Sequence, residues 1–350
     1  MRLGDISVAY AELMARAVRE QGGQPEALLA QYQLDAVRLA SPQARISIPR
    51  FMRLGHDLIQ AAAMPWLGLA MGRLTSAPVM GLAGLLAQSA PDIRSACRAL
   101  TDYELLSSFN ARGRSSFQTI QGQGVLQFYS ISPYNGYNLF VVDSVLAGWA
   151  QFLQQLSGRR DILLRVEVEF APPAYRDRYA DYFPCEVQFG ATRNALVLKA
   201  GALVLPVLGR CASTYAALQT LAARELERVR LGLSYRELTE RAIGPLLNGQ
   251  TPTLEQVAQR LNSAPWTVRR RLQDEGFSFQ QVLNETRRDL AVSYVRDTAL
   301  TLGEVAYLLG FGSAAAFQRA FKRWTGEAPG RFREHRGKNY ISTASSTSSS

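Results

Sequence analysis

Residues 301–329 read TLGEVAYLLGFGSAAAFQRAFKRWTGEAP, and this stretch decides the fold of the C-terminal part of the chain. Four apolar residues recur at i, i+3, i+4 and i+7 and therefore share one face of a helix: Leu302, Val305, Ala306 and Leu309. The glycines of Gly310-Phe311-Gly312 indicate a turn, after which Phe317 and Phe321 anchor a second helix. Two short helices around such a turn are typical of a helix-turn-helix unit.

The same pattern occurs once more, earlier in the chain. The corresponding apolar residues lie 48 positions earlier and are Leu254, Val257, Ala258 and Leu261. The anchors of the next helix, Val268 and Leu272, lie 49 positions before Phe317 and Phe321, so the second copy has one more residue in its turn. We therefore predict an all-α domain with two helix-turn-helix units joined by a helix. A generic helical bundle is the alternative, but it predicts no repeat with matching anchors.

Helix-capping signals support these boundaries. Thr301 with Glu304 and Ser278 with Gln281 each have the pattern of a capping box, and the second box opens the connecting helix. Glycines, which often follow the last residue of a helix, lie where two of the helices should end: Gly276 and Gly326.

The second helix of each unit turns polar and small side chains outward once its apolar anchors face the core. They are Trp266, Arg269, Arg270 and Gln273 in the first unit, and Ala314, Ala315, Gln318, Arg319 and Lys322 in the second. An arginine can donate two hydrogen bonds to guanine, a glutamine can pair with adenine, and an alanine or an indole can contact the thymine methyl group. Both helices are therefore equipped to read a major groove, although any single arginine here could equally belong to a solvated face.

Further basic residues and one helix start suit the phosphate backbone of DNA. Free amide groups at a helix N-terminus attract an anion, and lysine or arginine side chains pair with phosphate. The predicted phosphate contacts are Ser313, Lys322, Arg323, Arg331 and Arg333.

Positive charge is concentrated in the same region. The 350 residues include 39 Lys and Arg against 29 Asp and Glu, a net charge of +10. The last 100 residues hold 14 basic and 9 acidic residues, so half of the excess charge lies in less than a third of the chain. Such a basic domain points towards nucleic acid or another anionic surface as the partner.

Composition excludes several classes of protein. Two histidines and three well-separated cysteines argue against a zinc hydrolase, a metal site or a disulfide framework. The motifs Gly-x-Ser-x-Gly, His-Glu-x-x-His and Gly-x-x-x-x-Gly-Lys are missing, so we expect neither an enzyme nor a cofactor. The sequence has no signal-peptide pattern and no apolar run of membrane-spanning length, so we expect a cytoplasmic protein without a membrane partner.

The first 230 residues alternate helical and strand-like periodicity. Helices are predicted at 3–20, 49–62, 91–107 and 136–156, and short strands at 117–120, 125–129, 166–170 and 195–198. Gly122-Gln123-Gly124 between the first two strands indicates a hairpin turn. We predict an α/β domain with helices on a small, mostly antiparallel sheet. A helical linker is expected at 211–250, and the Ser-rich segment 338–350 is expected to be disordered.

An aromatic cluster is the candidate for a small-molecule pocket, because such pockets have mostly apolar walls with a few polar groups. The cluster consists of Phe128, Tyr129, Tyr134, Tyr137 and Phe140. Aromatic clusters of this kind are more often part of the core. Three arginines could meet a carboxylate ligand or simply face solvent: Arg112, Arg114 and Arg165. The cysteines are expected to be small buried apolar residues: Cys97, Cys185 and Cys211.

With these motifs in place, residues 253–333 resemble the DNA-binding domain of the AraC/XylS transcription regulators. The second unit follows the family signature from Glu304-Val305-Ala306 to Gly326-Glu327-Ala328-Pro329. The resemblance implies that both recognition helices enter successive major-groove segments. Ala264 departs from the family, which usually has a serine cap there. The resemblance places base-reading positions on Trp266, Arg269, Arg270, Ala314, Ala315, Gln318 and Arg319.

The N-terminal part is similar to the arabinose-binding-like domain of ornithine-utilisation regulators. The similarity rests on segments such as Leu67-Gly68-Leu69-Ala70-Met71-Gly72 and Phe170-Ala171-Pro172-Pro173. It implies an effector-sensing or dimerisation domain at 1–210 ahead of the DNA-binding domain at 251–337.

The sequence therefore predicts a homodimeric transcription regulator that binds double-stranded promoter DNA, contacts RNA polymerase and responds to a small-molecule effector. The alternative is a small-molecule-binding protein whose basic domain is an architectural, weakly sequence-specific DNA binder. The two differ in how strongly one operator is preferred over random DNA.

Overall fold

The computed structural model describes residues 4–41, 44–110, 112–130, 133–231 and 235–334 of the chain. These residues form two compact units, one before residue 232 and one after residue 234, and each has its own buried apolar side chains. The tail predicted to be disordered at 338–350 lies outside the described residues.

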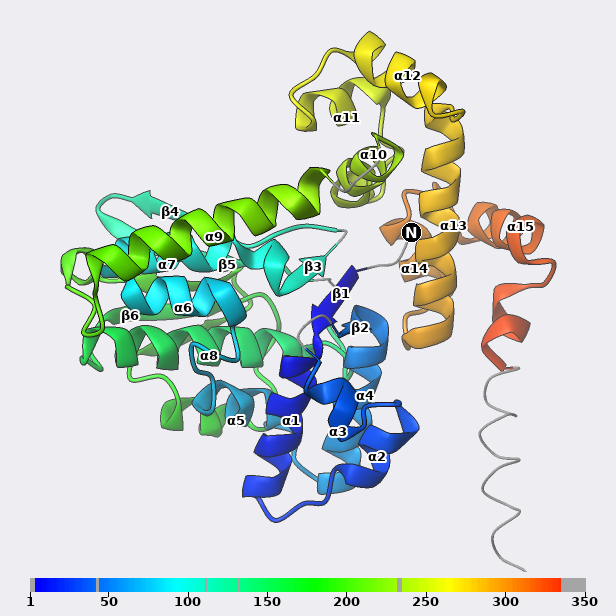
Figure 1. Ribbon diagram of the computed structural model, residues 1–350. Helices are drawn as coiled ribbons and strands as arrows, with labels where there is room; N and C mark the ends of the chain where they lie inside the picture. The colour runs from blue at the N-terminus through cyan, green and yellow to red at the C-terminus, as the bar shows by residue number, and fades with distance from the viewer. Residues whose placement is uncertain (1–3, 42–43, 111, 131–132, 232–234, 335–350) are drawn as a thin grey trace, which may run out of the picture. The chain divides into compact units, whose positions relative to one another are not determined.

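Two sheets form the framework of the first unit (Figure 1). The smaller is antiparallel with the strand order β2-β1-β3, from β1 (Gly4–Ser7), β2 (Arg45–Ser47) and β3 (Ser108–Asn110). The larger has the order β4-β5-β8-β6-β7 and contains one parallel pair, β6 with β7. Its strands are β4 (Ser116–Ile120), β5 (Gln123–Phe128), β6 (Leu163–Val168), β7 (Glu186–Phe189) and β8 (Asn194–Leu198). The predicted class, helices with small and mostly antiparallel sheets, is confirmed.

Helices pack on both sheets and on one another. They are α1 (Val8–Glu20), α2 (Glu26–Gln31), α3 (Ala36–Leu39), α4 (Ile48–Ala62), α5 (Leu67–Arg73), α6 (Gly81–Ser89), α7 (Ile93–Asp102), α8 (Leu139–Ser157) and α9 (Ala212–Leu231), with the short 3-10 turns η1 (Glu104–Leu106), η2 (Arg176–Asp181) and η3 (Ala200–Val204). Figure 1 shows α8 running along the larger sheet. One buried apolar cluster surrounds α8 and this sheet, and another joins α1, α4 and α5.

Two glycines bring α5 close to α8. A β-carbon at Gly68 would lie 2.2 Å from the carbonyl oxygen of Phe140, and one at Gly72 would lie 2.3 Å from the β-carbon of Ala147. These distances are far below van der Waals contact, so any larger residue would push the helices apart. Both glycines belong to the segment that resembles the family, so the close packing of these helices explains that part of the pattern.

Some predicted boundaries are wrong. The helix predicted at 3–20 begins at Val8, because residues 4–7 pair with two strands distant in sequence and Ser7 caps the helix through the amide of Ala9. The hairpin turn consists of Gln121 and Gly122, both with positive φ, while residues 123 and 124 already belong to β5. The other predicted strands overlap β4, β5, β6 and β8.

The second unit consists of helices, as predicted. They are α10 (Tyr235–Ile243), α11 (Leu254–Arg260), α12 (Pro265–Asp274), α13 (Phe279–Asp297), α14 (Leu302–Leu308) and α15 (Ala314–Thr325), with a short 3-10 turn, η4 (Gly244–Leu246). The pairs α11–α12 and α14–α15 are the two copies of the repeat, and the long helix α13 connects them (Figure 1). Both predicted capping boxes are present, at Ser278 and at Thr301.

The turns of the two copies share one backbone conformation. Asn262 has a φ of +48° and Gly310 a φ of +68°, and the two lie 48 positions apart. Glycine adopts this left-handed region freely, and asparagine is one of the few other residues that tolerate it. A β-carbon at Gly310 would also lie 2.1 Å from the carbonyl oxygen of Gln250, so the second turn requires glycine.

The segment 211–250, expected as one helical linker, contains helices of different units. Helix α9 belongs to the first unit and α10 to the second. The carboxylate of Glu275, at the end of α12, accepts hydrogen bonds from the backbone amides of Tyr235 at 2.6 Å and Arg236 at 2.9 Å. This carboxylate satisfies free amides at the start of α10 and interacts favourably with its helix dipole, which fixes α10 to the first helix-turn-helix unit.

A missing cap gives a first prediction. Ala264 is the N-cap of α12 and makes no side-chain hydrogen bond, whereas its counterpart Ser313 accepts one from the amide of Ala316 at 3.2 Å. We expect Ala264→Ser to raise the free energy of unfolding of the second unit by about 1 kcal/mol, measured by urea unfolding of the full chain. Ser313→Ala is the matched control and should lower it by a similar amount. Equal stability of both variants and the parent would contradict the capping role.

Candidate functional site

The outer face of α12 presents the side chains that the sequence predicts as base readers. Val268 and Leu272 are fully buried, while Trp266 is 64% exposed and Arg269 and Arg270 are exposed as well. The Arg270 guanidinium lies 5.6 Å from the centre of the Trp266 ring, so the two side chains share one face and stack by a cation–π contact. The exposed indole, stacked beside a guanidinium, suits a contact with a partner.

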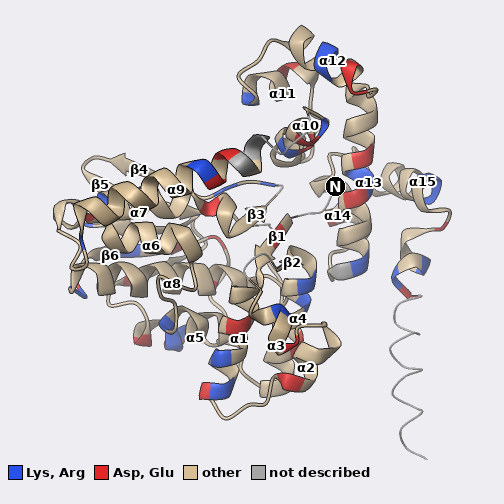
Figure 2. Cartoon of the chain, in the orientation of Figure 1, with Lys and Arg blue, Asp and Glu red and all other residues tan. Residues whose placement is uncertain are grey.

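Helix α15 has the equivalent arrangement. Phe317 and Phe321 are fully buried, so the opposite face of the helix is free for contact. On that face Ala315, Gln318 and Arg319 are exposed, and Ala314 is half-buried. Figure 2 shows basic residues on both α12 and α15. The structure thus places all seven predicted base-reading residues on the outer parts of two equivalent helices.

The predicted phosphate contacts fall into two groups. Lys322, Arg323 and Arg331 are exposed. Ser313 is exposed too, but its hydroxyl already accepts the amide of Ala316. The half-buried guanidinium of Arg333 donates to the carbonyl oxygens of Val295 at 3.0 Å and Leu300 at 2.7 Å, so it ties the segment after α15 to the end of α13. Arg333 therefore stabilises the fold of this unit, whereas Lys322, Arg323 and Arg331 are exposed to solvent.

A buried arginine that the sequence analysis did not select holds the second helix-turn-helix unit. Arg287 of α13 is 7% exposed. Its guanidinium donates to the carbonyl oxygens of Leu309 and Gly310, each at 2.8 Å, and to the hydroxyl of Thr251 at 2.9 Å. It also lies 4.9 Å from the centre of the Phe311 ring. This side chain connects α13, the turn before α15 and the segment before α11.

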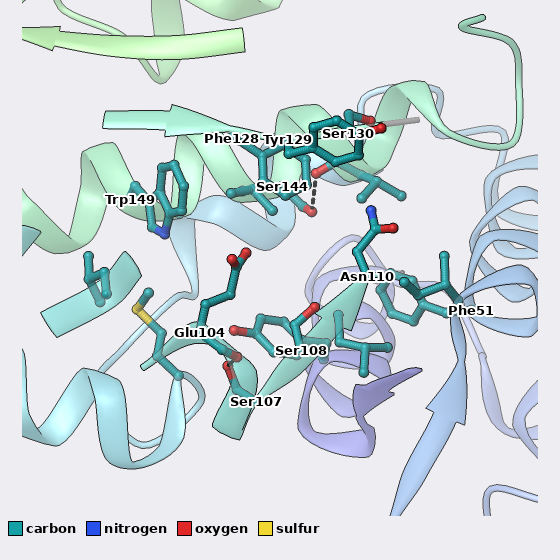
Figure 3. Close-up of a pocket in the computed structure, with 18 of the residues that line it drawn as sticks. Phe51, Glu104, Ser107, Ser108, Asn110, Phe128, Tyr129, Ser130, Ser144 and Trp149 are labelled. Carbon is teal, nitrogen blue, oxygen red and sulfur yellow. Dashed lines mark hydrogen bonds between the residues drawn. The ribbon is translucent and has the colours of Figure 1, made fainter. Parts of the chain in front are cut away.

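The first unit contains a cavity of about 110 Å³, drawn in Figure 3. Its walls come from α1, α4, α8, η1, β3 and the end of β5, so it lies where the two apolar clusters of this unit meet. A cavity that holds one water molecule needs about 10–15 Å³ by this measure, so the space corresponds to roughly seven to eleven waters. This size suits a small organic ligand.

Of the five predicted pocket aromatics, two line the cavity: Phe128 and Tyr129. The other three do not. The hydroxyl of Tyr134 donates to the carboxylate of Glu169. Tyr137 stacks on His56 with ring centres 4.1 Å apart, and Phe140 packs on Phe51 at 5.7 Å. The periodicity of the sequence could not separate these rings, because their partners lie far away in the chain.

The polar part of the cavity wall was not anticipated. It includes Glu104, Ser107, Ser108 and Asn110 from one short segment. The arginines considered as partners of a carboxylate ligand, Arg112, Arg114 and Arg165, are not among its lining residues. Arg165 pairs instead with Glu167 at 2.7 Å. The helix predicted at 91–107 ends at Asp102, so Glu104 and Ser107 lie beyond the observed helix. The sequence signal that could have found the segment is the run of small polar residues around the predicted end of that helix.

The cysteines differ from the expectation at one position. Cys97 is buried, as expected, and burial raises the pKa of its thiol. Cys185 is half-buried, and burial raises the pKa of its thiol to about 11. Cys211, expected to be buried, is exposed just before α9, where hydrogen bonds with the hydroxyls of Ser213 and Thr214 lower the pKa of its thiol to about 7.

Within the described parts of the chain, none of the helices has the length and apolar character to cross a membrane. The same residues bring together no group of three or more His, Cys, Asp and Glu side chains that could hold a metal ion.

Two family models cover most of the chain. Residues 22–207, more than half of the sequence, match the arabinose-binding domain of AraC transcription regulators, an N-terminal domain. Residues 257–335 match a helix-turn-helix domain.

Similar proteins match this chain over nearly its whole length. The ornithine utilization regulator of Pseudomonas aeruginosa is 28% identical over 333 residues, which cover 94% of this chain and 96% of that protein. The transcriptional regulator VirS of Mycobacterium tuberculosis is 24% identical over 332 residues, with coverages of 94% and 95%. Among solved structures, the transcriptional regulator CdpR from Pseudomonas aeruginosa has a TM-score of 0.41 and 22% identity, over 89% of this chain and 96% of its own.

The family resemblance seen in the sequence is thereby confirmed for both parts of the chain. The relatives are regulators rather than enzymes, in agreement with the expectation that the chain catalyses no reaction. A ligand-binding domain precedes a DNA-binding helix-turn-helix domain, and the chain belongs to the AraC family of transcription regulators.

Proposed function

We propose that this regulator recognises promoter sequences by inserting α12 and α15 into successive segments of the major groove. The observation that carries this proposal is the pair of equivalent helices, 49 residues apart, which bury matching anchors and expose arginine, glutamine and tryptophan on the opposite face. Arginine and glutamine hydrogen bonds to base edges would supply specificity, and Lys322, Arg323 and Arg331 would neutralise phosphates. In this reading the second helix relies on Gln318 and Arg319, since its two alanines are short.

We further propose that the first unit controls this activity. A small-molecule effector would occupy the cavity of the first unit. The protein would act in the cytoplasm as a homodimer, which presents two DNA-binding domains to the two half-sites of one operator. Contact with RNA polymerase would then change the rate of transcription. The domain division that goes with this proposal is sensing or dimerisation at 1–210, a linker at 211–250 and DNA binding at 251–337. The linker then includes α9 of the first unit and α10 of the second.

Selection of binding sites from a pool of random DNA tests the main proposal. A specific regulator should prefer the selected site over random duplex by roughly a thousandfold or more at physiological salt. An architectural, weakly specific binder, the alternative function, would enrich no sequence and would bind both DNAs alike.

The division between base readers and phosphate anchors gives a second prediction. We expect Arg270→Ala and Arg319→Ala each to cost about 1–3 kcal/mol on the selected site and to relax the preference at one base pair. Arg331→Ala should instead weaken binding to all sequences and reduce the salt dependence of the affinity by about one phosphate contact. Titration of the selected and mismatched duplexes at several salt concentrations separates these effects. Identical behaviour of the three variants would contradict the division.

A further inference from the structure

The cavity of the first unit has a distinct electrostatic character. Among the described residues that line it, Glu104 is the only carboxylate, and no lysine, arginine or histidine is present. Apart from this group the lining residues are apolar side chains, hydroxyls, amides and glycines. A ligand inside the cavity therefore meets one fixed acidic group and no basic one.

The protein holds this carboxyl group in a defined position. Glu104 lies at the start of η1, and its two carboxylate oxygens accept hydrogen bonds from the amide of Ser115 at 2.9 Å and from its hydroxyl at 2.7 Å. Ser115 itself is buried. Figure 3 shows the Glu104 side chain pointing into the space bordered by Trp149 and Phe128. Burial raises the pKa of Glu104, and a positive charge placed beside it would favour the ionised form.

Aromatic side chains line the same cavity as the carboxyl group. The rings of Phe128 and Trp149 meet edge to face with centres 6.1 Å apart, and both line the cavity. Tyr10 and Phe51 contribute further rings. The faces of such rings attract cations, most strongly for an indole. The Ser108 hydroxyl also lines the cavity and makes no other side-chain hydrogen bond within the described residues, so it is available to a ligand.

These features discriminate between classes of ligand. An anionic ligand would lie beside Glu104 without a basic partner among the lining residues, which is unfavourable in a buried site. The charge of Arg114, which is outside the lining, acts on Glu104 and favours its ionised form. A neutral ligand would form an ordinary hydrogen bond, whereas an ammonium group would form a charge-assisted bond of roughly twice the strength. The size of the cavity suits a ligand with on the order of ten non-hydrogen atoms.

We propose that the cavity binds a small organic amine, with its ammonium group on the Glu104 carboxylate and the Ser108 hydroxyl and its apolar body against Phe128 and Trp149. This inference rests on the proposed function in one respect, namely that the cavity is the effector site.

Calorimetric titration of the full chain with three matched probes tests the class of ligand. Phenethylamine, 2-phenylethanol and 3-phenylpropanoate share a phenyl group and differ in the polar end. We expect the amine to bind at least tenfold more tightly than the alcohol, because a hydrogen bond of roughly twice the strength raises the affinity by about tenfold. The carboxylate should show no binding. An alcohol or a carboxylate that binds as tightly as the amine would overturn the proposal, and so would an amine that does not bind.

A variant tests the residue. Glu104→Gln keeps the shape and its oxygen can accept from the Ser115 amide, while its NH2 group donates to the Ser115 hydroxyl, which reverses that hydrogen bond. The charge is removed, so amine affinity should fall tenfold or more while alcohol affinity stays within about twofold. Glu186→Gln removes an exposed carboxylate from β7 and is the matched control, with unchanged affinities expected. An equal loss for amine and alcohol in Glu104→Gln would contradict a charge-specific role. Circular dichroism checks folding, and if Glu104→Gln does not fold, the comparison of probes on the unmodified chain decides alone.

A DNA-binding assay on the same preparations separates the two proposals. Failure of the amine with a retained preference for the selected DNA site rejects the ligand class and leaves the regulator proposal intact. Amine binding by a protein without any DNA sequence preference rejects the proposed regulatory specificity and supports the ligand site.

Discussion

Arg287→Met is expected to destabilise the DNA-binding unit by about 3 kcal/mol and to weaken DNA binding by this unit. Methionine fills much of the aliphatic volume but removes the donor to the carbonyl oxygen of Leu309 and leaves that of Gly310 with only the 3.4 Å hydrogen bond from the Thr251 hydroxyl. Each buried acceptor without a partner costs about 1–3 kcal/mol. Part of this cost is offset because the substitution removes a charge that is costly to bury. The same burial lowers the pKa of Arg287 in the native protein. The net effect is a loss, since the guanidinium forms three hydrogen bonds at 2.8–2.9 Å.

Urea unfolding of the full chain measures this effect, with the fluorescence of Trp266 and Trp324 as the signal from the second unit. The matched control is Arg288→Met, the same substitution at the next position of α13. Arg288 is exposed and pairs with the neighbouring Asp289 at 3.0 Å, so its removal should change stability by no more than about 0.5 kcal/mol. Similar losses of unfolding free energy in both variants would show that the three hydrogen bonds of Arg287 do not stabilise the unit. Arg287→Lys should also be destabilised, because an ammonium group cannot reproduce the planar fork.

The DNA-binding unit was predictable because its determinants are local. Helix α14 shows this most clearly, since its cap, its last apolar anchor and the glycine after it lie within a dozen residues, at Thr301, Leu309 and Gly310. Arg287 shows the limit of this reasoning. It lies on the apolar stripe of α13 with Leu283, Leu290 and Tyr294, and a charged residue on such a stripe is a signal of a buried partner. The identity of that partner, the turn around residue 310, could not be read from the pattern.

The small sheet of the first unit was missed for a physical reason. Its strands have three or four residues, too few for a period of two to stand out, and they are formed by pairing over long distances in the chain. Ile6 pairs with Ile46 on one side and with Ser108 on the other. The cavity depends on the same long-range contacts, since its walls extend from Ile6 to Trp149. The family resemblance predicted a sensing domain, but only the packed structure identifies Glu104 as its acidic group.

The stability of the first unit is expected to fall as the pH rises from about 4.5 to 7.5, because of one buried carboxyl group. Asp143 of α8 is 1% exposed and accepts hydrogen bonds from the hydroxyls of Tyr179 at 2.5 Å and Tyr175 at 2.8 Å. Burial raises its pKa from 3.8 to about 7, although both hydroxyls favour the ionised form. Above pH 4 the unfolded chain has released this proton while the folded chain still holds it, so unfolding releases a proton and becomes easier as the pH rises.

The magnitude follows from the width of this window. Each pH unit between the two pKa values is worth about 1.4 kcal/mol, so the loss from pH 4.5 to 7 is about 3 kcal/mol and the curve is flat above the folded pKa. Asp143→Asn keeps one of the two oxygens that accept the tyrosine hydroxyls, and its NH2 group can donate to the other hydroxyl. Because this side chain cannot ionise, the unfolding free energy of the variant should lack this slope and exceed that of the parent near pH 7.5. Glu104 also has a raised pKa from burial and contributes a slope of the same sign, which the variant leaves in place.

Urea unfolding is measured at a series of pH values through the fluorescence of Trp66 and Trp149 in the first unit. It gives the slope of the unfolding free energy against pH directly. Asp161→Asn is the control, because Asp161 is exposed and pairs with Arg159 at 2.8 Å, an arrangement that lowers its pKa and adds little to stability. The control should retain the slope of the parent, whereas Asp143→Asn should lose most of it. If the parent and Asp143→Asn lose stability in parallel over this range, then Asp143 is ionised in the folded protein, and the two tyrosine hydroxyls outweigh its burial.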